Sequence, residues 1–274
     1  METNSVEGCH IGRLRWLVAG SQILGLASVI MTGVWLGHYH GGFAWDRTPH
    51  QFNVHPLCMV LGMVFLYGDA ILVYRTLRNE GKTTLKVLHA VIHLIALVVV
   101  IVGESAVACN ENGSKRQCRA GIAAVFDLHI AKKVPNLYSL HSWCGLSIII
   151  LFCLQWVMGL AFFLFPGVTY SLRTIYYPYH VFFGLALFIL SIGTCLTGIT
   201  EVLLTSIRDT YSKFDPQGIL ANALGLVLVC FGLLVGYILT RSEWKLPVSS
   251  EEEALSLHFK TLTEGGSPSS LRRQ

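Results

Sequence analysis

Histidine is the residue of this chain whose type and spacing could do chemistry. The chain holds 11 histidines against 20 basic and 16 acidic residues. Ionisable side chains at membrane depth are costly, so they mark functional sites, and neutral imidazole is a standard axial ligand of haem iron. Five histidines lie inside or at the ends of long apolar runs: His55, His89, His93, His141 and His180.

Long apolar stretches supply the elements that must position these histidines. The chain has 274 residues, of which 53% are hydrophobic and only 13% are charged, roughly half the charged share of an average soluble domain. This composition excludes a soluble enzyme, a disordered protein and a fibrous protein. It predicts an all-α membrane protein with six transmembrane helices, since a bilayer crossing takes about 20 helical residues. The six stretches are approximately 16–37, 54–74, 85–103, 140–165, 179–200 and 218–240.

The basic residues predict how the six-helix domain, residues 16–240, is oriented. With the N-terminus in the cytosol, nine basic residues fall on the inner side and eight on the outer side. Without the polar segment 104–121 the count is nine against five, which places both tails, 1–15 and 241–274, in the cytosol. The basic residues sit in short connecting segments rather than on one face, so nucleic-acid binding has no support, and membrane lipid is the expected surrounding.

The histidines then fall at two depths. His55 and His141 begin the second and fourth helices at the outer face, whereas His89, His93 and His180 lie near the cytosolic ends of the third and fifth helices. Two neutral imidazoles on facing helices can clamp a haem. The pattern therefore favours a bundle of helices 2–5 with two bis-histidine haem sites, on the order of 20 Å apart along the membrane normal.

Other interpretations stay open at this point. A single membrane histidine is more often an interhelical hydrogen-bonder, and a zinc or proton transporter normally sets acidic residues beside its histidines. The acidic residue inside the spans is Asp69, interpreted as an interfacial residue that water can reach. His89 and His93 are one helical turn apart, so spacing does not say which is the ligand. The other could hydrogen-bond a propionate or a neighbouring helix.

Five segments resemble the cytochrome b-561 family. They are FNVHPLCMVLG, LVYRTLRNEGKTTLKVLHAVIH, LYSLHSWCGL, SLRTIYYPYHVFFG and FKTLTEG, and the similarity runs from Leu14 to Gly265. The resemblance implies two haem b groups and electron transfer from cytosolic ascorbate to monodehydroascorbate radical in the lumen of a secretory vesicle of the chromaffin-granule type. It also implies a homodimer. The alternatives are a transmembrane ferric reductase that uses ascorbate and, from another class, a histidine-lined metal or proton transporter.

The resemblance also implies roles for individual residues. It gives the lumenal haem to His55 and His141 and the cytosolic haem to His89 and His180, which settles the choice between His89 and His93 by analogy. Ascorbate and haem propionates are anions, which Arg and Lys side chains bind. The alternative explanation for basic residues at the helix ends is that they only anchor the helices by the positive-inside rule. The implied haem surroundings are Arg75, Lys82, Asn136, Leu137, Tyr138, Ser139, Glu201 and Lys245. The implied substrate residues are Lys82, Lys86 and Arg173 for cytosolic ascorbate, and His129 and Tyr138 for the lumenal substrate.

The segment 104–121 departs from the family pattern. In the family, the third helix continues from a glycine like Gly103 directly into a segment like 122–126, whereas here 18 polar and small residues intervene. We expect them to end the third helix early or to form a longer outer loop, which affects where His129 lies. In the lumen, Cys109 and Cys118 could form a disulfide, and Asn112 opens a glycosylation triplet.

Overall fold

The computed structural model describes residues 2–46, 48–110 and 138–246, and within them every regular element is helical. In this described part of the chain, six helices are long and apolar enough to cross a membrane, as the composition predicts. The first span is α1 (Glu2–Tyr39) and the third is α5 (Lys82–Asn110). The second span is a succession of four elements: α2 (Pro49–Phe52), α3 (Val54–Met59), the π-helical η1 (Val60–Leu66) and α4 (Tyr67–Thr76). The last three are formed by α7 (Leu140–Gly159) with η2 (Leu160–Leu164), by α8 (Tyr170–Ser206) and by α10 (Pro216–Thr240); α9 (Arg208–Tyr211) and η3 (Ser242–Trp244) are short.

Local sequence signals set several helix ends. The Ser139 side chain accepts a hydrogen bond from the Ser142 amide at the start of α7, and Asp215 does the same for Gln217 at the start of α10. Such N-caps satisfy amide groups that have no partner inside the helix. The chain turns after α1 at Gly41 and Gly42, whose φ angles of 79° and 89° favour glycine. The caps fix the first residues of α7 and α10, and the Ser139 cap thereby places His141 in the first turn of α7.

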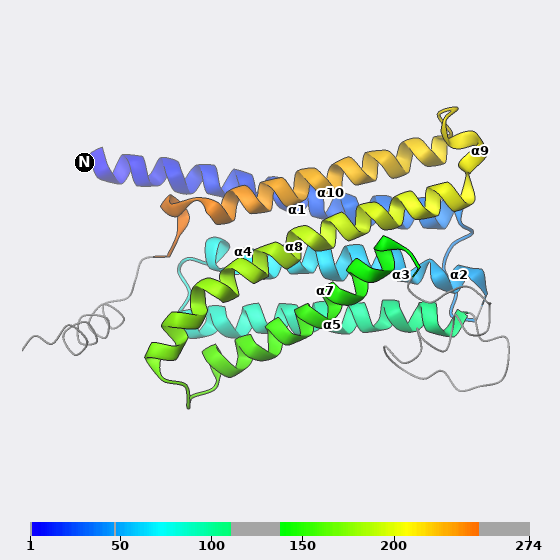
Figure 1. Cartoon of the computed structure of the whole chain (residues 1–274). Helices are drawn as coiled ribbons and strands as arrows, with labels where there is room; N and C mark the ends of the chain where they lie inside the picture. Colours follow the sequence, from blue (N-terminus) through cyan, green and yellow to red (C-terminus); the bar gives the residue numbers. More distant parts are fainter. Residues whose placement is uncertain (1, 47, 111–137, 247–274) are drawn as a thin grey trace, which may run out of the picture. The chain divides into compact units, whose positions relative to one another are not determined.

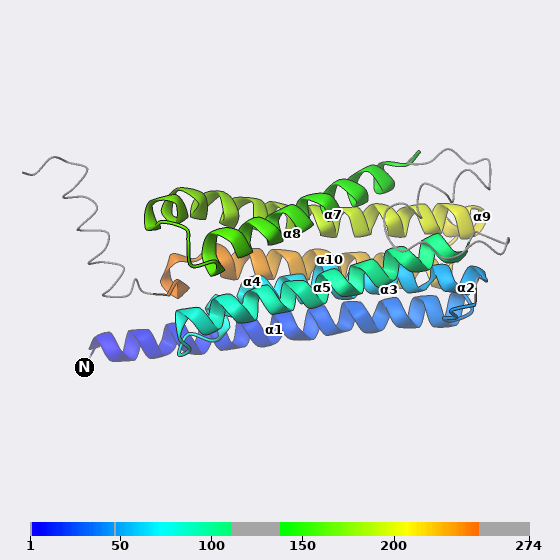
Figure 2. The same cartoon turned by 90° about the horizontal axis from the view of Figure 1, so that it is seen from below.

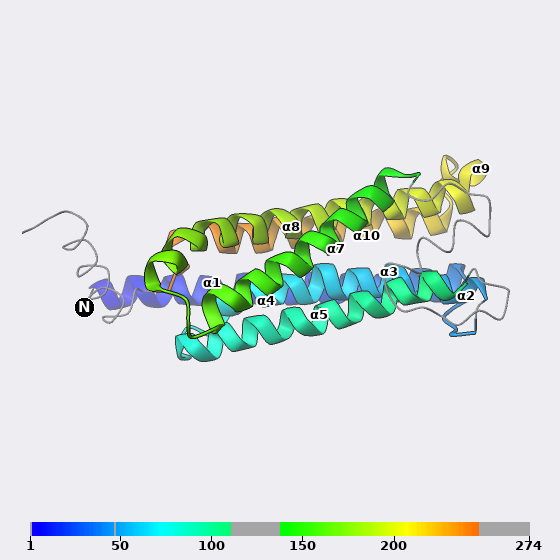
Figure 3. The same ribbon diagram turned by 60° about the horizontal axis from the view of Figure 1, so that its bottom comes forward.

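The spans form one bundle within the unit Met1–Trp244; Lys245–Gln274 is a separate unit. Helix α1 lies along α10, and α10 also contacts α8 (Figures 1 and 2). The continuous run α3–η1–α4 packs against α5, while α7 packs against α8 and crosses obliquely toward the start of α5 (Figure 3). The start of α1 and the end of α10 lie at the same end of the bundle, here called the terminal end. The opposite end, which carries α2 and α9, is here called the α9 end.

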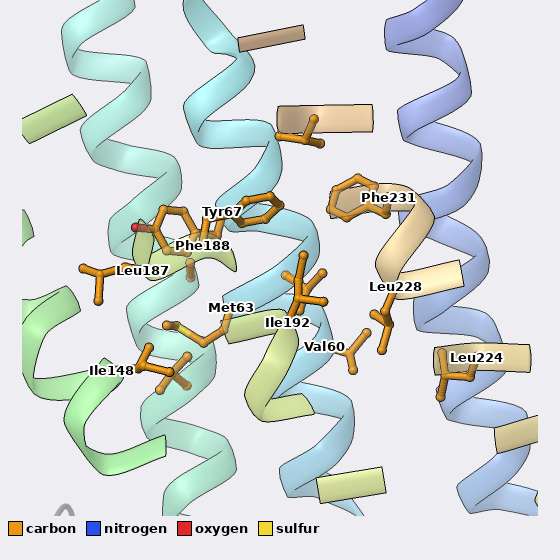
Figure 4. Packing of buried hydrophobic residues seen from close by; sticks show 14 of the residues in the cluster. Val60, Met63, Tyr67, Ile148, Leu187, Phe188, Ile192, Leu224, Leu228 and Phe231 are labelled. Atoms are coloured by element: carbon orange, nitrogen blue, oxygen red, sulfur yellow. The ribbon is translucent and has the colours of Figure 1, made fainter. Parts of the chain in front are cut away.

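Apolar side chains fill the centre of the bundle and also cover much of its outside. Tyr67, Phe188 and Phe231 meet between α4, α8 and α10 and are at most 1% exposed (Figure 4). On α1, by contrast, a stripe of large apolar residues at helical spacing is more than half exposed: Ile23, Leu26, Ile30 and Val34. An exposed apolar face of this length is typical of contact with lipid. The molecule is therefore an integral membrane protein.

Two helices are longer than the apolar runs predict. Helix α5 does not end at Gly103 but continues through Asn110, because residues 104–110 contain neither glycine nor proline and the Ser105 hydroxyl bonds back to the Ile101 carbonyl. Helix α8 begins at Tyr170, with Pro178 inside it, so His180 lies well within the helix rather than at its start. The hydropathy pattern misses both extensions because polar residues, among them Glu104, Asn110 and Arg173, interrupt their apolar ones.

The N-terminal segment and Asp69 also differ from expectation. Helix α1 already begins at Glu2, so residues 2–15 are helical. Asp69 does not simply face water: its carboxylate accepts a 2.6 Å hydrogen bond from the Gln22 side chain, and the carboxyl group is partly buried between α4 and α1. A polar partner on a neighbouring helix makes an acidic residue tolerable at this depth.

Candidate functional site: two histidine pairs

The structure brings the membrane histidines together in two pairs. The rings of His55 on α3 and His141 on α7 have centroids 6.3 Å apart, and their planes are perpendicular, at 90°. The rings of His89 on α5 and His180 on α8 have centroids 6.1 Å apart with planes at 66°. All four histidines are half-buried. Depth along the sequence predicts a pair on the second and fourth spans and a pair on the third and fifth, but leaves His89 and His93 open; the structure sets His89 opposite His180.

The ring spacing fits a metal held between two imidazoles. Metal–imidazole bonds are about 2.0 Å long. With ring bonds of about 1.33 Å, the centre of an imidazole lies roughly 1.1 Å from its nitrogen. Two rings bound in line to one metal would therefore have centres roughly 6.2 Å apart. The observed 6.3 Å and 6.1 Å agree with this value at both pairs.

Backbone carbonyls hold one ring of each pair. The Nδ1 atom of His89 donates to the Ala70 carbonyl at 2.8 Å, and the Nδ1 atom of His141 donates to the Thr194 carbonyl at 2.9 Å. A carbonyl only accepts, so in both rings Nδ1 carries the proton and Nε2 is left with its lone pair. Metal-binding histidines are typically fixed in this way by a partner on the other ring nitrogen.

The partner rings have different neighbours. The Gln155 side-chain nitrogen donates to the His180 backbone carbonyl at 2.7 Å and lies 3.1 Å from its Nδ1. The Nδ1 atom of His55 lies 3.5 Å from a carboxylate oxygen of Glu104. Sequence reasoning missed Gln155, although an amide side chain inside the apolar run 140–165 is a usable signal.

Two glycines of the bundle give the rings room. A Cβ atom on Gly198 would lie 2.7 Å from Cε1 of His141, and one on Gly159 would lie 3.1 Å from Cε1 of His180. Real Cβ atoms essentially never approach closer than 3.0 Å. The position of the His141 ring therefore requires glycine at position 198.

The two pairs lie at opposite ends of the bundle. His89 is level with Ala70, and His55 precedes Ala70 by 15 residues in the run α3–η1–α4. His141 is level with Thr194, and His180 precedes Thr194 by 14 residues in α8. At about 1.5 Å per residue, both routes give a separation of roughly 20 Å. This agrees with the distance that the sequence predicts.

His93 lies beside the His89–His180 pair rather than in it. Its ring is 4.6 Å from that of His89 and packs edge-on against Tyr67 and Phe152, at 4.8 and 5.5 Å. Unlike the four paired rings, His93 is buried, at 6% exposure, and among the described residues its Nδ1 atom has no hydrogen-bond partner. His93 is therefore less accessible to a ligand than the four paired histidines, which are half-buried.

Basic residues gather at the terminal end, beside His89 and His180. Buried Arg75 donates to the Leu239 carbonyl at 2.7 Å, and Arg173 donates to the Phe165 carbonyl at 3.0 Å. Nη1 of Arg75 and Nε of Arg173 are buried and, within the described part of the chain, have no partner. Lys82 and Lys86 occupy the first turns of α5, seven and three residues before His89.

Polar residues at the α9 end lie close to His141. The Tyr138 hydroxyl donates to Glu201 at 2.8 Å, and Ser139 caps α7 two residues before His141. The hydrogen bond to Glu201 and the nearby negative charge raise the pKa of Tyr138 above its ordinary value. The other predicted residues at this end, His129, Asn136 and Leu137, lie outside the described residues, as do Asn112 and Cys118. Lys245 belongs to the second unit, Lys245–Gln274.

The donor set itself separates haem from a metal-transport site. Within residues 2–46, 48–110 and 138–246, no group of three or more His, Cys, Asp or Glu side chains gathers where it could hold a metal ion. Pairs of histidines whose rings lie about 6 Å apart suit an iron whose other ligands come from a porphyrin. The residues present therefore fit haem.

Comparisons with known proteins agree with this geometry. The family model for eukaryotic cytochrome b561 matches residues 54–119 and 117–206, so it covers all four paired histidines. The chain is 54% identical over 259 residues to the transmembrane ascorbate-dependent reductase CYB561 of Sus scrofa, covering 94% of this chain and 95% of that protein.

Two further relatives are more distant. The lysosomal membrane ascorbate-dependent ferrireductase CYB561A3 of Homo sapiens is 41% identical, over 85% of this chain and 90% of its own. The plasma membrane ascorbate-dependent reductase CYBRD1 of Xenopus tropicalis is 40% identical, over 87% of this chain and 79% of its own. The chain thus belongs to the eukaryotic cytochrome b561 family.

Proposed function

We propose that this protein is an ascorbate-dependent oxidoreductase that carries electrons across a membrane through two haem b groups. The electrons pass from ascorbate at the terminal end to monodehydroascorbate radical at the α9 end. One observation carries the proposal: two histidine pairs, each with the ring spacing that iron requires, lie roughly 20 Å apart on membrane-spanning helices. Membership of a b-type cytochrome family and relatives named as ascorbate-dependent reductases support it.

His55 with His141, and His89 with His180, would hold the irons of the two haems. Bound haem would supply a one-electron Fe(III)/Fe(II) couple inside the bundle. The chain supplies orientation: the carbonyls of Ala70 and Thr194 accept Nδ1–H of His89 and His141, which leaves Nε2 of each ring free to bind a metal. Because all four ligands are neutral imidazoles on helices that packing holds in place, little reorganisation accompanies a change in charge.

Arg75, Arg173, Lys82 and Lys86 would bind anions at the terminal end. The buried Nη1 of Arg75 and Nε of Arg173 have no partner among the described residues, and a carboxylate is the group that such donors suit. We assign Arg75 to a haem propionate, and Arg173 with the two lysines to the ascorbate monoanion. Lys245 is proposed for the haem surroundings on sequence alone.

At the α9 end, Tyr138 is proposed for the second substrate and Glu201 for the surroundings of the haem. Their hydrogen bond places a phenol and a carboxylate next to the first turn of α7, which carries His141. Reduction of an ascorbate radical is coupled to proton uptake, so polar groups that exchange protons suit this end. His129, Asn136, Leu137 and Ser139 are proposed for the same region on the basis of the sequence.

The membrane is proposed to be that of a secretory vesicle, with both termini in the cytosol and the chain as a homodimer. The basic residues of the terminal end support this orientation by the positive-inside rule. Since relatives include a plasma membrane and a lysosomal reductase, ferric reduction at the α9 end is the second candidate, favoured by the ferrireductase CYB561A3.

Haem content tests the ligand assignment. Purified protein should take up two haems and show a reduced b-type spectrum with ascorbate. His55→Ala and His180→Ala should each lose one haem, whereas His38→Gln, a matched control on the exposed side of α1, should keep both. A protein without visible absorbance that transports a metal or dissipates a pH gradient would instead be a transporter. If His55→Ala and His180→Ala each keep two haems, the assignment of His55 and His180 as haem ligands is rejected.

A further inference from the structure

Glu104 lies directly behind His55 in the pair near the α9 end. One of its carboxylate oxygens is 3.5 Å from Nδ1 of His55, and the two side chains are only 23% and 15% exposed. His55 comes from α3 and Glu104 from α5, so the contact joins two helices. It is the closest acidic group to any of the four paired histidines that the described part of the chain shows.

His55 needs a partner that its counterparts already have. The Nδ1 atoms of His89 and His141 donate to backbone carbonyls, whereas Nδ1 of His55 is buried and makes no hydrogen bond within the described residues. Besides Glu104, the group facing this nitrogen is the backbone of Gly103. A histidine that binds a metal nearly always donates its other N–H to a carboxylate, a carbonyl or water. Here the carboxylate and the carbonyl compete.

Close helix packing fixes Glu104 in this position. A Cβ atom on Gly103 would lie 2.7 Å from Cβ of Cys58 and 2.9 Å from the end of Met59, so only glycine lets α5 approach α3 this closely. Glu104 is the next residue, and α5 continues without interruption past it to Asn110. The backbone around Glu104 is therefore held on both sides, and its side chain reaches His55 without a loop.

Glu104 belongs to the part of the chain that departs from the family pattern. The resemblance to the family implies that residues 104–121 depart from the family pattern, and Glu104 is the first of these 18 residues. The family model matches the chain in two stretches that overlap within this segment, 54–119 and 117–206. We therefore expect the carboxylate beside His55 to be particular to this chain.

We propose that Glu104 is a positioning residue for His55: its carboxylate accepts the Nδ1–H of the ring and lowers the reduction potential of the haem at this pair. This inference rests on the proposed function, which places haem there. A carboxylate acceptor gives the imidazole more negative character, which makes it a stronger donor to iron. Stronger donation stabilises Fe(III) over Fe(II), so the potential falls.

The test is a potentiometric titration of the purified holoprotein, followed by visible absorbance and by electron paramagnetic resonance of the two ferric haems. Glu104→Gln keeps the shape and removes the charge. We expect the haem at His55 to become at least tenfold easier to reduce, equivalent to about 59 mV for one electron. Its resonance should shift, while the haem at His89 keeps both its potential and its signal.

Two further variants control the experiment. Glu104→Asp, which keeps a carboxylate, should stay closer to the wild type than Glu104→Gln. Ser105→Ala removes a neighbouring hydroxyl that bonds within its own helix and should change neither potential. If Glu104→Gln and Glu104→Asp both lose the haem at His55, the only role of Glu104 is in packing, and the proposal fails.

The outcomes separate the two levels of the account. If each of the two haems has the same reduction potential in Glu104→Gln as in the wild type, Nδ1 of His55 donates to Gly103 instead. That result rejects the role of Glu104 and leaves the proposed function standing. A wild-type protein that binds no haem would reject the proposed function itself.

Discussion

At the scale of single residues, the site consists of rings held by atoms that are far away in sequence. Depth along the apolar runs predicts the pair His55–His141 and a second pair of His180 with His89 or His93, because histidines are rare at membrane depth; the choice of His89 comes from the family resemblance. The atoms that fix the rings are not visible in this way. The Thr194 carbonyl is a backbone atom, which any residue type would supply, and Gly198 becomes meaningful only once α8 is packed on His141.

Gly198 gives the first prediction. In Gly198→Ala the new Cβ would lie 2.7 Å from the His141 ring, so the ring must shift and its haem should be lost or weakened, with the other haem retained. Gly193→Ala is the matched control, since it lies on the same helix with nothing within 4 Å of its Cβ position. Haem-to-protein ratios of the two variants check this. Equal ratios would mean that His141 is not held as described.

The second prediction concerns the neighbours His89 and His93. His89→Ala should remove one haem, whereas His93→Phe should keep both, because His93 is buried among Tyr67 and Phe152 and a ring of similar size fits its place. The reduced spectrum and the haem count measure both variants. Loss of a haem in His93→Phe with retention in His89→Ala would reverse the assignment.

At the scale of elements, the apolar runs predict the six crossings but not their full lengths. Helix α5 gains seven residues beyond Gly103, since backbone hydrogen bonding carries a helix on when no breaker intervenes. Helix α8 gains nine residues before Tyr179, although Pro178 is one of them. Helix ends depend on such local bonding, which hydropathy does not report.

The third prediction belongs to the joint between α1 and α10. The Gln217 side chain donates to Nε2 of His40 at 2.8 Å, and burial lowers the pKa of His40 below 6.5. The folded state therefore binds fewer protons than the unfolded state, so this contribution to stability is complete above pH 6.5 and is lost as the pH falls through the folded pKa. The melting temperature in detergent should fall on acidification.

The variant His40→Gln cannot bind that proton, so its melting temperature should depend less on pH between 7 and 5 than that of the wild type. His38→Gln, on the neighbouring exposed turn, should behave like the wild type. Parallel curves for the wild type and His40→Gln would show that His40 does not link folding to pH.

At the scale of the whole molecule, the two ends of the bundle differ in charge. The terminal end carries Arg75, Arg173, Lys82 and Lys86 near one histidine pair, while the α9 end carries Tyr138 and Glu201 near the other. This asymmetry gives the proposed electron path its direction, because an anionic donor is bound at the basic end. The sequence predicts the asymmetry from helix order alone, whereas the unpartnered nitrogens of Arg75 and Arg173 require the packed structure.

The fourth prediction tests the basic end. Lys86→Gln should raise KM for ascorbate by ~10-fold with little change in kcat, since a charge-assisted contact to a bound anion contributes about 1.5–3 kcal/mol. The effect should shrink at high salt. Arg15→Gln, which removes a basic residue of α1, is the matched control and should leave KM unchanged. An unchanged KM in Lys86→Gln would move the ascorbate site elsewhere.

Transfer of electrons across a sealed membrane tests the central claim most directly. Proteoliposomes loaded with ascorbate are mixed with a membrane-impermeant acceptor outside, and reduction of the acceptor is followed for the wild type and for His55→Ala. The account predicts steady reduction by the wild type and almost none by His55→Ala, which keeps its other haem but lacks the second step of the path. Equal rates for the two proteins, or no reduction by a wild type that carries both haems, would contradict it.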